Sequence, residues 1–168
     1  MTSPATIQTT FDLYFNAAKL GELYDRRSSV TESFVAQAAI RFGQAVVAGT
    51  DLDRQVTIPA GTGMTFRGIS IAVWQIEQQI TAYPTTSSGS YPIASVVPVL
   101  RRGSIWVRVN QDVVIDDPVY FVHTDADPLK VGNFRKDADT NKADLVPTAV
   151  FRKAAKAGEL AVVEINLP

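Results

Sequence analysis

The sequence predicts an all-β protein, an antiparallel β-sandwich or barrel of roughly eight strands preceded by an extended N-terminal arm. Three observations predict this fold class. Short apolar runs alternate with polar residues at the two-residue period of a strand. Turn residues separate these runs at intervals of about 8 to 15 residues, which is typical of sandwiches and barrels. No strongly amphipathic helical pattern longer than ~12 residues interrupts them.

Two parts are expected within the 168 residues, an arm over residues 1–30 and a single β domain over residues 31–168. The arm has no sustained period of 2 or 3.6 residues, so it cannot build a core of its own. It nevertheless carries aromatic side chains, and burying a phenylalanine is worth ~1.5–3 kcal/mol. We therefore expect its aromatics to lie against a partner or against the β domain. These residues are Phe11, Tyr14, Phe15 and Tyr24.

The first half of the β domain carries four predicted strands. Apolar and other residues alternate over 33–42, which favours a strand, although the alanine content leaves a short helix as the rival interpretation. Valine runs predict further strands at 46–47 and 56–58. Alternation over 69–73 predicts a fourth, and Gly68 before it suggests a bulge or a close backbone approach.

The most distinct local pattern predicts a hairpin. Apolar residues over 96–100 are followed by Arg101-Arg102-Gly103 and then by the run 105–109. A glycine between two apolar runs is typical of a tight turn. Ile105, Val107 and Val109 should therefore face the core.

The remaining pattern predicts strands at 119–122, 149–152 and 160–167. Small polar residues flanked by two Tyr-Pro pairs predict a surface loop over 83–92. The polar stretch 125–144 predicts a long loop or a weak hairpin.

Composition excludes several classes of function. The 16 basic and 17 acidic residues give a formal net charge of -1, which provides no broad positive field for nucleic acid or an anionic membrane. The absence of cysteine excludes disulfides, thiolate metal sites and cysteine nucleophiles. The sequence has neither a signal-peptide pattern nor an apolar run of ~18 residues, so we expect neither secretion by a signal peptide nor a membrane span.

Candidate catalytic groups are few. His123 is the only histidine, and no nucleophile elbow or paired acid with a defined role accompanies it, so we interpret it as a strand-end or loop residue. Gly61-x-Gly63 precedes a strand instead of opening a helix, so it is a flexible turn and not a phosphate cradle. We expect no catalytic site and no cofactor.

Two acidic stretches are candidate cation sites. Asp125-x-Asp127 and Asp137-x-Asp139-x-Asn141 each place hard oxygen ligands close together. Counted from Asp137, however, Lys142 and Thr148 occupy the sixth and twelfth positions, where a calcium loop has glycine and glutamate. The preferred interpretation is that these carboxylates form turns and hold no metal.

Basic pairs and tryptophans are the candidate partner-binding residues. Arg26-Arg27 and Arg101-Arg102 could reach acidic groups of a partner through charge-assisted hydrogen bonds, although such pairs are often solvated turns. Trp74 and Trp106 fall opposite the aliphatic residues of their strands. Each is either part of a second core face or an exposed anchor for another subunit, and Trp106 is counted among the partner-binding candidates.

Three segments resemble the structural cement, or capsid decoration, proteins of tailed bacteriophages. The most distinctive reads Val-Pro-Val-Leu-Arg-Arg-Gly-Ser-Ile-Trp-Val over residues 97–107, and the others are residues 40–47 and 157–165. The resemblance implies a non-enzymatic virion protein on the outer surface of the capsid, made in the host cytoplasm. Its implied partners are the major capsid protein and copies of itself, for which we expect a trimer.

Three other functions stay open at this point. The chain could be another virion component, such as a tail or head-completion protein. It could be a glycan-binding β-sandwich that stacks sugars on Trp74, Tyr83, Tyr91 or Trp106. A hydrolase could use the carboxylates of the two acidic stretches.

Overall fold

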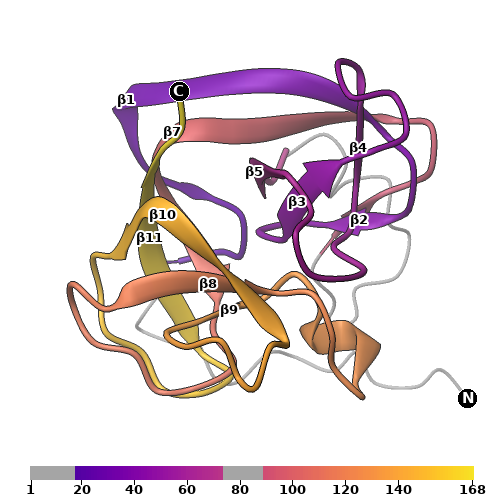
Figure 1. Cartoon of the computed structure of the whole chain (residues 1–168). Coiled ribbons are helices and arrows are strands. Elements are labelled where there is room, and N and C mark those ends of the chain that lie inside the picture. Colours follow the sequence, from indigo (N-terminus) through magenta and orange to yellow (C-terminus); the bar gives the residue numbers. More distant parts are fainter. Residues whose placement is uncertain (1–17, 74–88) are drawn as a thin grey trace, which may run out of the picture.

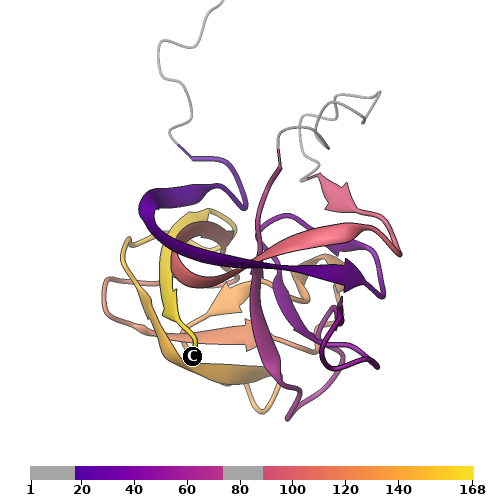
Figure 2. The ribbon, with the colours of Figure 1, turned by 90° about the horizontal axis from the view of Figure 1, so that it is seen from above.

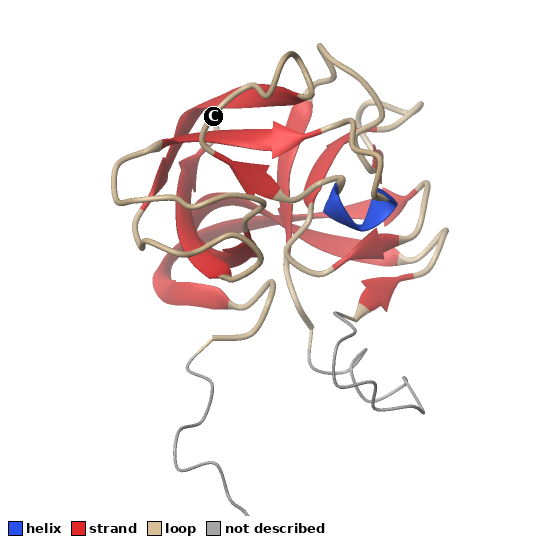
Figure 3. Ribbon diagram, turned by 90° about the horizontal axis from the view of Figure 1, so that it is seen from below, coloured by secondary structure: helices blue, strands red, loops and turns tan. Residues whose placement is uncertain are grey.

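The computed structural model describes residues 18–73 and 89–168, and their regular secondary structure is almost entirely strand (Figure 3), which confirms the all-β prediction. The only helical element in the described residues is a 3-10 turn. The elements are β1 (Leu23–Ala36), β2 (Ile40–Arg41), β3 (Ala45–Ala48), β4 (Gln55–Thr57), β5 (Phe66–Ser70), β6 (Ser90–Tyr91), β7 (Val96–Arg108), β8 (Pro118–Val122), η1 (Pro128–Lys130), β9 (Phe134–Arg135), β10 (Ala143–Phe151) and β11 (Leu160–Asn166).

Nine of the strands form one sheet in the order β1-β4-β3-β5-β7-β11-β10-β8-β9, and β2 and β6 form a two-stranded sheet. All pairs of strands in the large sheet are antiparallel except β1 and β4. Strand β1 also pairs with β7, so the sheet folds back on itself. The end strands β1 and β9 do not pair with each other in the described residues, so the nine strands do not form one closed barrel. The expected sandwich is not confirmed. The described residues contain eleven strands, more than the roughly eight that were predicted.

Strand β7 shows that the predicted hairpin at residues 101–103 is wrong, because the chain continues in one direction through these residues. On one side, β11 pairs with β7 in an unbroken register from Arg102 to Arg108, including Gly103 opposite Ile165. On the other side, β1 pairs with β7 on both flanks of Gly103. The glycine has a φ of +129°, a conformation that L side chains rarely adopt, and it is used for a bend inside a strand.

Strand β1 accompanies β7 through this bend. The two strands run side by side across the top of Figure 1 and change direction together, near the C-terminus. From above they form a long twisted ribbon (Figure 2). Register shifts between Asp25 and Val30 mark the bulge opposite Gly103. The C-terminal residues pack there too, since Leu167 N donates to Arg101 O. We call this region the corner.

Strand β1 begins at Leu23, earlier than the alternation at 33–42 predicted. Residues 23–30 were expected in the arm, but they belong to the sheet, while residues 1–17 lie outside the described residues. At the other end the strand stops at Ala36, and β2 resumes at Ile40. The rival prediction of a helix over 33–42 is wrong. The division into an arm and a β domain stays a prediction.

Two apolar clusters make the core, and the central strands contribute to both. In β3, Ala45 and Val47 join one cluster while Val46 joins the other, so this short run is buried on both faces. In β7, Val97 and Val99 lie in the smaller cluster. The larger cluster contains Ile105, Val107 and Val109, as predicted for these three residues.

Other predicted elements are confirmed or corrected as follows. Strands near 46–47, 56–58, 119–122, 149–152 and 160–167 are present as β3, β4, β8, β10 and β11. The predicted strand at 69–73 is shifted to β5. Within the predicted loop 83–92, the described part contains β6, and the stretch 125–144 contains η1 and β9. No helix in the described residues is long and apolar enough to cross a membrane.

Candidate functional site

The corner carries an aromatic pair with a lysine above it. Tyr24 from β1 meets Trp106 from β7 edge to face, with 5.7 Å between ring centroids. Lys153, which follows β10, places Nζ 4.9 Å from the centroid of Tyr24 and 5.1 Å from that of Trp106. Tyr24 is 50% exposed and Trp106 is partly buried. The cluster is therefore a surface feature in which a cation lies over two aromatic rings.

Two arginines of the predicted basic pairs lie near the aromatic pair. Arg102, Ser104 and Trp106 are alternate residues of β7 in unbroken register with β11, so their side chains share one face of the sheet. Arg26 follows Tyr24 by two residues in β1 and lies in the bulge between Asp25, which pairs with Ser104, and Val30, which pairs with Arg102. We call Tyr24, Arg26, Arg102, Trp106 and Lys153 together the corner face.

The cations of the corner face lack acidic partners. Arg26 and Arg102 are exposed, and neither side chain makes a hydrogen bond or ion pair with the described residues. Lys153 lies over the two rings, and its side chain makes no ion pair with the described residues. The protein as a whole has a formal net charge of -1, so this local excess of positive charge is not a general property of its surface.

Two carboxylates near the corner face, Asp25 and Glu164, are already paired. Asp25 accepts hydrogen bonds from the Arg27 guanidinium, with Nη2 3.1 Å from Oδ2, and the hydrogen bonds from Arg27 lower the pKa of Asp25. Glu164 accepts from Arg152 Nε at 2.6 Å, and this hydrogen bond raises the pKa of Arg152. Neither carboxylate neutralises the cations of the corner face.

Arg101 differs from Arg102 because its side chain packs against other parts of the protein. Its side chain is 13% exposed, and Nη1 and Nη2 each donate at 2.8 Å, to Arg67 O and Pro168 O. Nε lies 3.5 Å from Glu32 Oε2. These contacts hold β5 and the C-terminal residues against β7. A partner-binding role of Arg101 stays a prediction.

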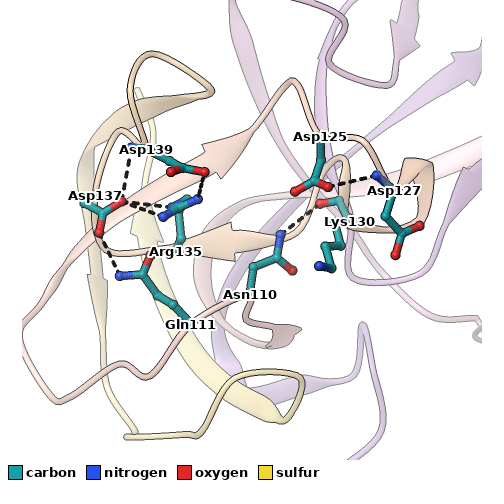
Figure 4. Close-up of polar contacts among 8 residues, drawn as sticks. All are labelled: Asn110, Gln111, Asp125, Asp127, Lys130, Arg135, Asp137 and Asp139. Atoms are coloured by element: carbon teal, nitrogen blue, oxygen red, sulfur yellow. Dashed lines mark hydrogen bonds and ion pairs between the residues drawn. The ribbon is translucent and has the colours of Figure 1, made fainter.

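The acidic stretch after β9 is held by one arginine (Figure 4). Arg135 Nη2 lies 2.8 Å from Asp137 Oδ1, and Nη1 donates to Asp139 Oδ2. Gln111 Nε2 donates to Asp137 Oδ2 at 2.9 Å, and this hydrogen bond, with the charge of Arg135, lowers the pKa of Asp137. Asp137 Oδ1 also accepts the backbone N–H of Asp139. Both carboxylates therefore have partners within the protein.

The other acidic pair forms turns, as the sequence indicated. Asp125 Oδ1 accepts from Asp127 N at 2.9 Å (Figure 4). Asp127 Oδ1 accepts from Leu129 N at the start of η1, also at 2.9 Å. In residues 18–73 and 89–168, no three histidine, cysteine, aspartate or glutamate side chains are gathered as metal ligands would be.

His123 lies directly after β8, so its predicted position at a strand end is confirmed. It is buried, and its Nδ1 is 2.9 Å from Thr124 Oγ1. Nε2 lies 3.7 Å from Asp144 Oδ1 and makes no hydrogen bond in the described structure. The two oxygens of Asp144 accept from Thr62 Oγ1 and Gly63 N, so this carboxylate holds the loop between β4 and β5.

The sequence predicts four residues of the corner face as partner-binding candidates but does not indicate the fifth, Lys153. The four are Tyr24, Arg26, Arg102 and Trp106. Lys153 sits in a turn 47 residues after Trp106, and no local pattern links the two. The candidates Phe11, Tyr14 and Phe15 lie outside the described residues, as do Trp74 and Tyr83. Tyr91 is fully buried and donates to Ile71 O, so it cannot serve as a sugar-stacking platform.

Comparison with known proteins finds a matching family model and solved structures similar to this chain. The family model described as "Structural cement protein (E217 gp24/Pam3 gp6)" matches residues 7–166. A chain of "the capsid of Myoviridae Phage XM1" has a similar fold, with a TM-score of 0.69 and 22% identity over 98% of this chain and 97% of that one. A chain of "head fiber gp8.5 N base in bacteriophage phi29" has a TM-score of 0.43 and 13% identity, covering 83% of this chain and 95% of that one.

No curated protein matches the sequence. The family match spans nearly the whole chain, in agreement with the resemblance noted at residues 97–107. Members of the family are structural proteins of the phage particle, which assigns this chain a structural role in the virion. The chain belongs to the phage structural cement protein family.

Proposed function

We propose that this protein binds the outer surface of a phage capsid and joins neighbouring subunits of the major capsid protein, without catalysing a reaction. The observation that carries the proposal is the family match over residues 7–166, because the family is described as one of structural cement. The protein would be made in the host cytoplasm and would reach the shell by assembly.

The physical basis of cementing is the sum of several weak contacts. A cement protein that binds as a symmetric oligomer engages several capsid subunits at once, and linked contacts can raise the overall affinity ~10²- to 10⁴-fold. This requires a body that holds its contacts at fixed positions. A continuous nine-stranded sheet with two apolar clusters is suited to that requirement. We propose a trimer as the binding unit.

Two measurements on one preparation test the proposal. Light scattering gives the oligomeric state, and co-sedimentation with expanded shells that lack the protein gives binding. We expect a trimer that pellets with the shells. A monomer that stays in the supernatant would contradict the cement function. Labelling of intact particles distinguishes a cement protein from a tail or head-completion protein, since only a cement protein covers the shell.

The N-terminal arm is proposed as a second attachment. The aromatics Phe11, Tyr14 and Phe15 are costly to leave in water, and a neighbouring subunit could bury them. Because β1 begins at Leu23, the deletion that tests this idea should remove residues 1–17 only. We expect unchanged thermal unfolding and weaker attachment to shells or weaker self-association. Equal shell affinity and an equal oligomeric state in the truncated protein would exclude this role of the arm.

A further inference from the structure

We infer that the corner face is the surface through which the protein grips an acidic, solvent-exposed segment of the major capsid protein. The inference rests on the proposed function, since it names the part of the molecule that makes the contact and the chemistry of the segment it contacts. It is argued from the residue types, the unpaired charge and the rigidity of the corner.

The residue types are those that dominate binding energy at protein interfaces. Tryptophan, tyrosine and arginine are enriched among the residues whose truncation costs most, and the corner face combines all three. Tyr24 and Trp106 supply apolar area with a hydrogen-bonding group at the edge of each ring. The Tyr24 hydroxyl makes no hydrogen bond with the described residues, so its donor and acceptor are available to a partner.

The unpaired charge gives the chemistry of the partner. Arg26, Arg102 and Lys153 have no carboxylate partner in the described structure, whereas Asp25 and Glu164 beside them are occupied by Arg27 and Arg152. A carboxylate of a partner would therefore meet cations whose hydrogen-bonding capacity is unused. Arginine presents a planar fork that matches a carboxylate in two parallel hydrogen bonds. The segment that fits this face is acidic.

The framework of the corner is rigid, which reduces the ordering that binding requires. Trp106 N donates to Glu22 O and Gly21 N donates to Trp106 O, so β1 and β7 are joined by backbone hydrogen bonds beside the aromatic pair. On the other side β11 pairs with β7 over seven consecutive positions, from Leu160 to Asn166. Lys153 is already held over the two rings. Binding energy is therefore not spent on arranging the backbone beside the two rings.

A pair of charge reversals tests the inference with a matched control. The corner variant is Arg26→Glu with Lys153→Glu. The control variant is Arg54→Glu with Lys142→Glu, two exposed cations whose side chains also make no ion pair with the described residues. Arg54 lies at the far end of β1, beside Val35, and Lys142 precedes β10 at the end opposite Lys153. Both variants change the net charge equally.

Co-sedimentation with expanded shells is measured for all three proteins over a range of salt concentrations. We expect the corner variant to bind about tenfold more weakly or worse and the control to bind like the parent. The affinity of the parent should fall as salt rises, and the corner variant should lose most of that dependence. Thermal unfolding of each variant confirms that the fold is intact.

Three results would overturn the inference. If the corner variant binds like the parent, the capsid protein contacts another face. If both variants lose affinity equally, the effect is one of net charge and not of this site. If the neutral variant Tyr24→Ser, which removes the exposed ring, leaves affinity unchanged, the aromatic pair is not part of the contact. A parent protein that ignores shells altogether would instead remove the proposed function itself.

Discussion

The corner and the loop between β9 and β10 are both charged parts of this protein, but they use charge in opposite ways. In this loop, Asp137 and Asp139 share the guanidinium of Arg135, whose side chain is only 14% exposed. At the corner, Arg26 and Arg102 are exposed and unpaired in the described structure. The loop satisfies its charges internally, whereas the corner leaves cations in water where a partner can reach them.

This difference shows why a charged sequence motif alone does not identify a binding surface. Each Asp-x-Asp stretch and each arginine pair places two like charges close together, but every carboxylate of the two stretches accepts a hydrogen bond from its own turn or from Arg135. Within the pair Arg101-Arg102, one side chain is turned into the fold and the next is exposed. The partners of each group, and not its spacing, decide which charges are available.

The largest expected effect breaks the corner at its bend. In Gly103→Val, a Cβ would lie 3.2 Å from the Ser29 Cα, at a φ of +129° that a valine rarely adopts. We expect a loss of about 3 kcal/mol or more in the free energy of unfolding, because strain and crowding add. Denaturant unfolding measures it.

Two other glycines separate the two contributions to that loss. Gly158 has a φ of +86° but nothing within 4 Å of its added Cβ, so Gly158→Val should cost only the backbone strain, about 1–2 kcal/mol. Gly61 has neither a positive φ nor a neighbour within 4 Å, and Gly61→Val should be nearly neutral. Equal losses at all three positions would show that the bend has no special requirement for glycine.

The same bend explains what could be predicted from the sequence. Strands such as β8 and β11 follow from local apolar runs, because each run is buried in the position where it stands. The local sequence Arg-Arg-Gly is compatible both with a hairpin turn and with a bend inside one strand. The difference is made by β11, whose Ile165 pairs with Gly103 although it lies 62 residues later. Long-range pairing of this kind leaves no signature in the residues of the turn itself.

The start of β1 escaped prediction for a related reason. From Tyr24 to Ser33 most residues are exposed, so no apolar alternation marks a strand, and its extended shape comes from pairing with β7. The candidate site was recognised in part. Aromatic and arginine residue types indicated Tyr24, Arg26, Arg102 and Trp106, but their common face and the contact of Lys153 required the tertiary structure.

A smaller effect is expected when the ion pairs of the loop between β9 and β10 are removed. Arg135→Met keeps most of the side-chain stem but leaves Asp137 and Asp139 without their cation. We expect a loss of about 1–3 kcal/mol in the free energy of unfolding, because a partly buried, charge-assisted network is broken. The comparison variant is Arg152→Met, whose cation is 47% exposed and should matter much less. A larger loss of unfolding free energy in Arg152→Met than in Arg135→Met would contradict the expectation that a partly buried ion pair stabilises the fold more than an exposed one.

Acid should weaken the loop between β9 and β10. The pKa of Asp137 is lowered by the Gln111 hydrogen bond and by Arg135, so the folded state favours the carboxylate. This stability is complete above the unfolded pKa, which is near 3.9 for aspartate, and it is lost as pH falls through the lower folded pKa. Urea unfolding at pH 6 and at about pH 2.5 should therefore show a smaller acid-induced loss in Asp137→Asn than in the parent.

The control for this pH effect is Asp53→Asn, since the Asp53 side chain is exposed and makes no hydrogen bond with the described residues. It should keep the full acid sensitivity of the parent. The effect of Asp137→Asn should be modest, because the Asp137 side chain is 53% exposed and water screens its interactions. If the parent and Asp137→Asn lose equal stability in acid, the hydrogen bonds to Asp137 contribute nothing to folding.

The smallest expected effect concerns the corner face itself. Arg26→Ala and Arg102→Ala remove exposed cations that hold nothing in the described structure, so the melting temperature should move by less than ~2 °C. Arg101→Ala should lower it more, because that side chain donates to Arg67 O and Pro168 O. A large fall in the melting temperature of Arg26→Ala or Arg102→Ala would mean that these side chains stabilise the fold. Their charge would then no longer be evidence that this surface is available to a partner.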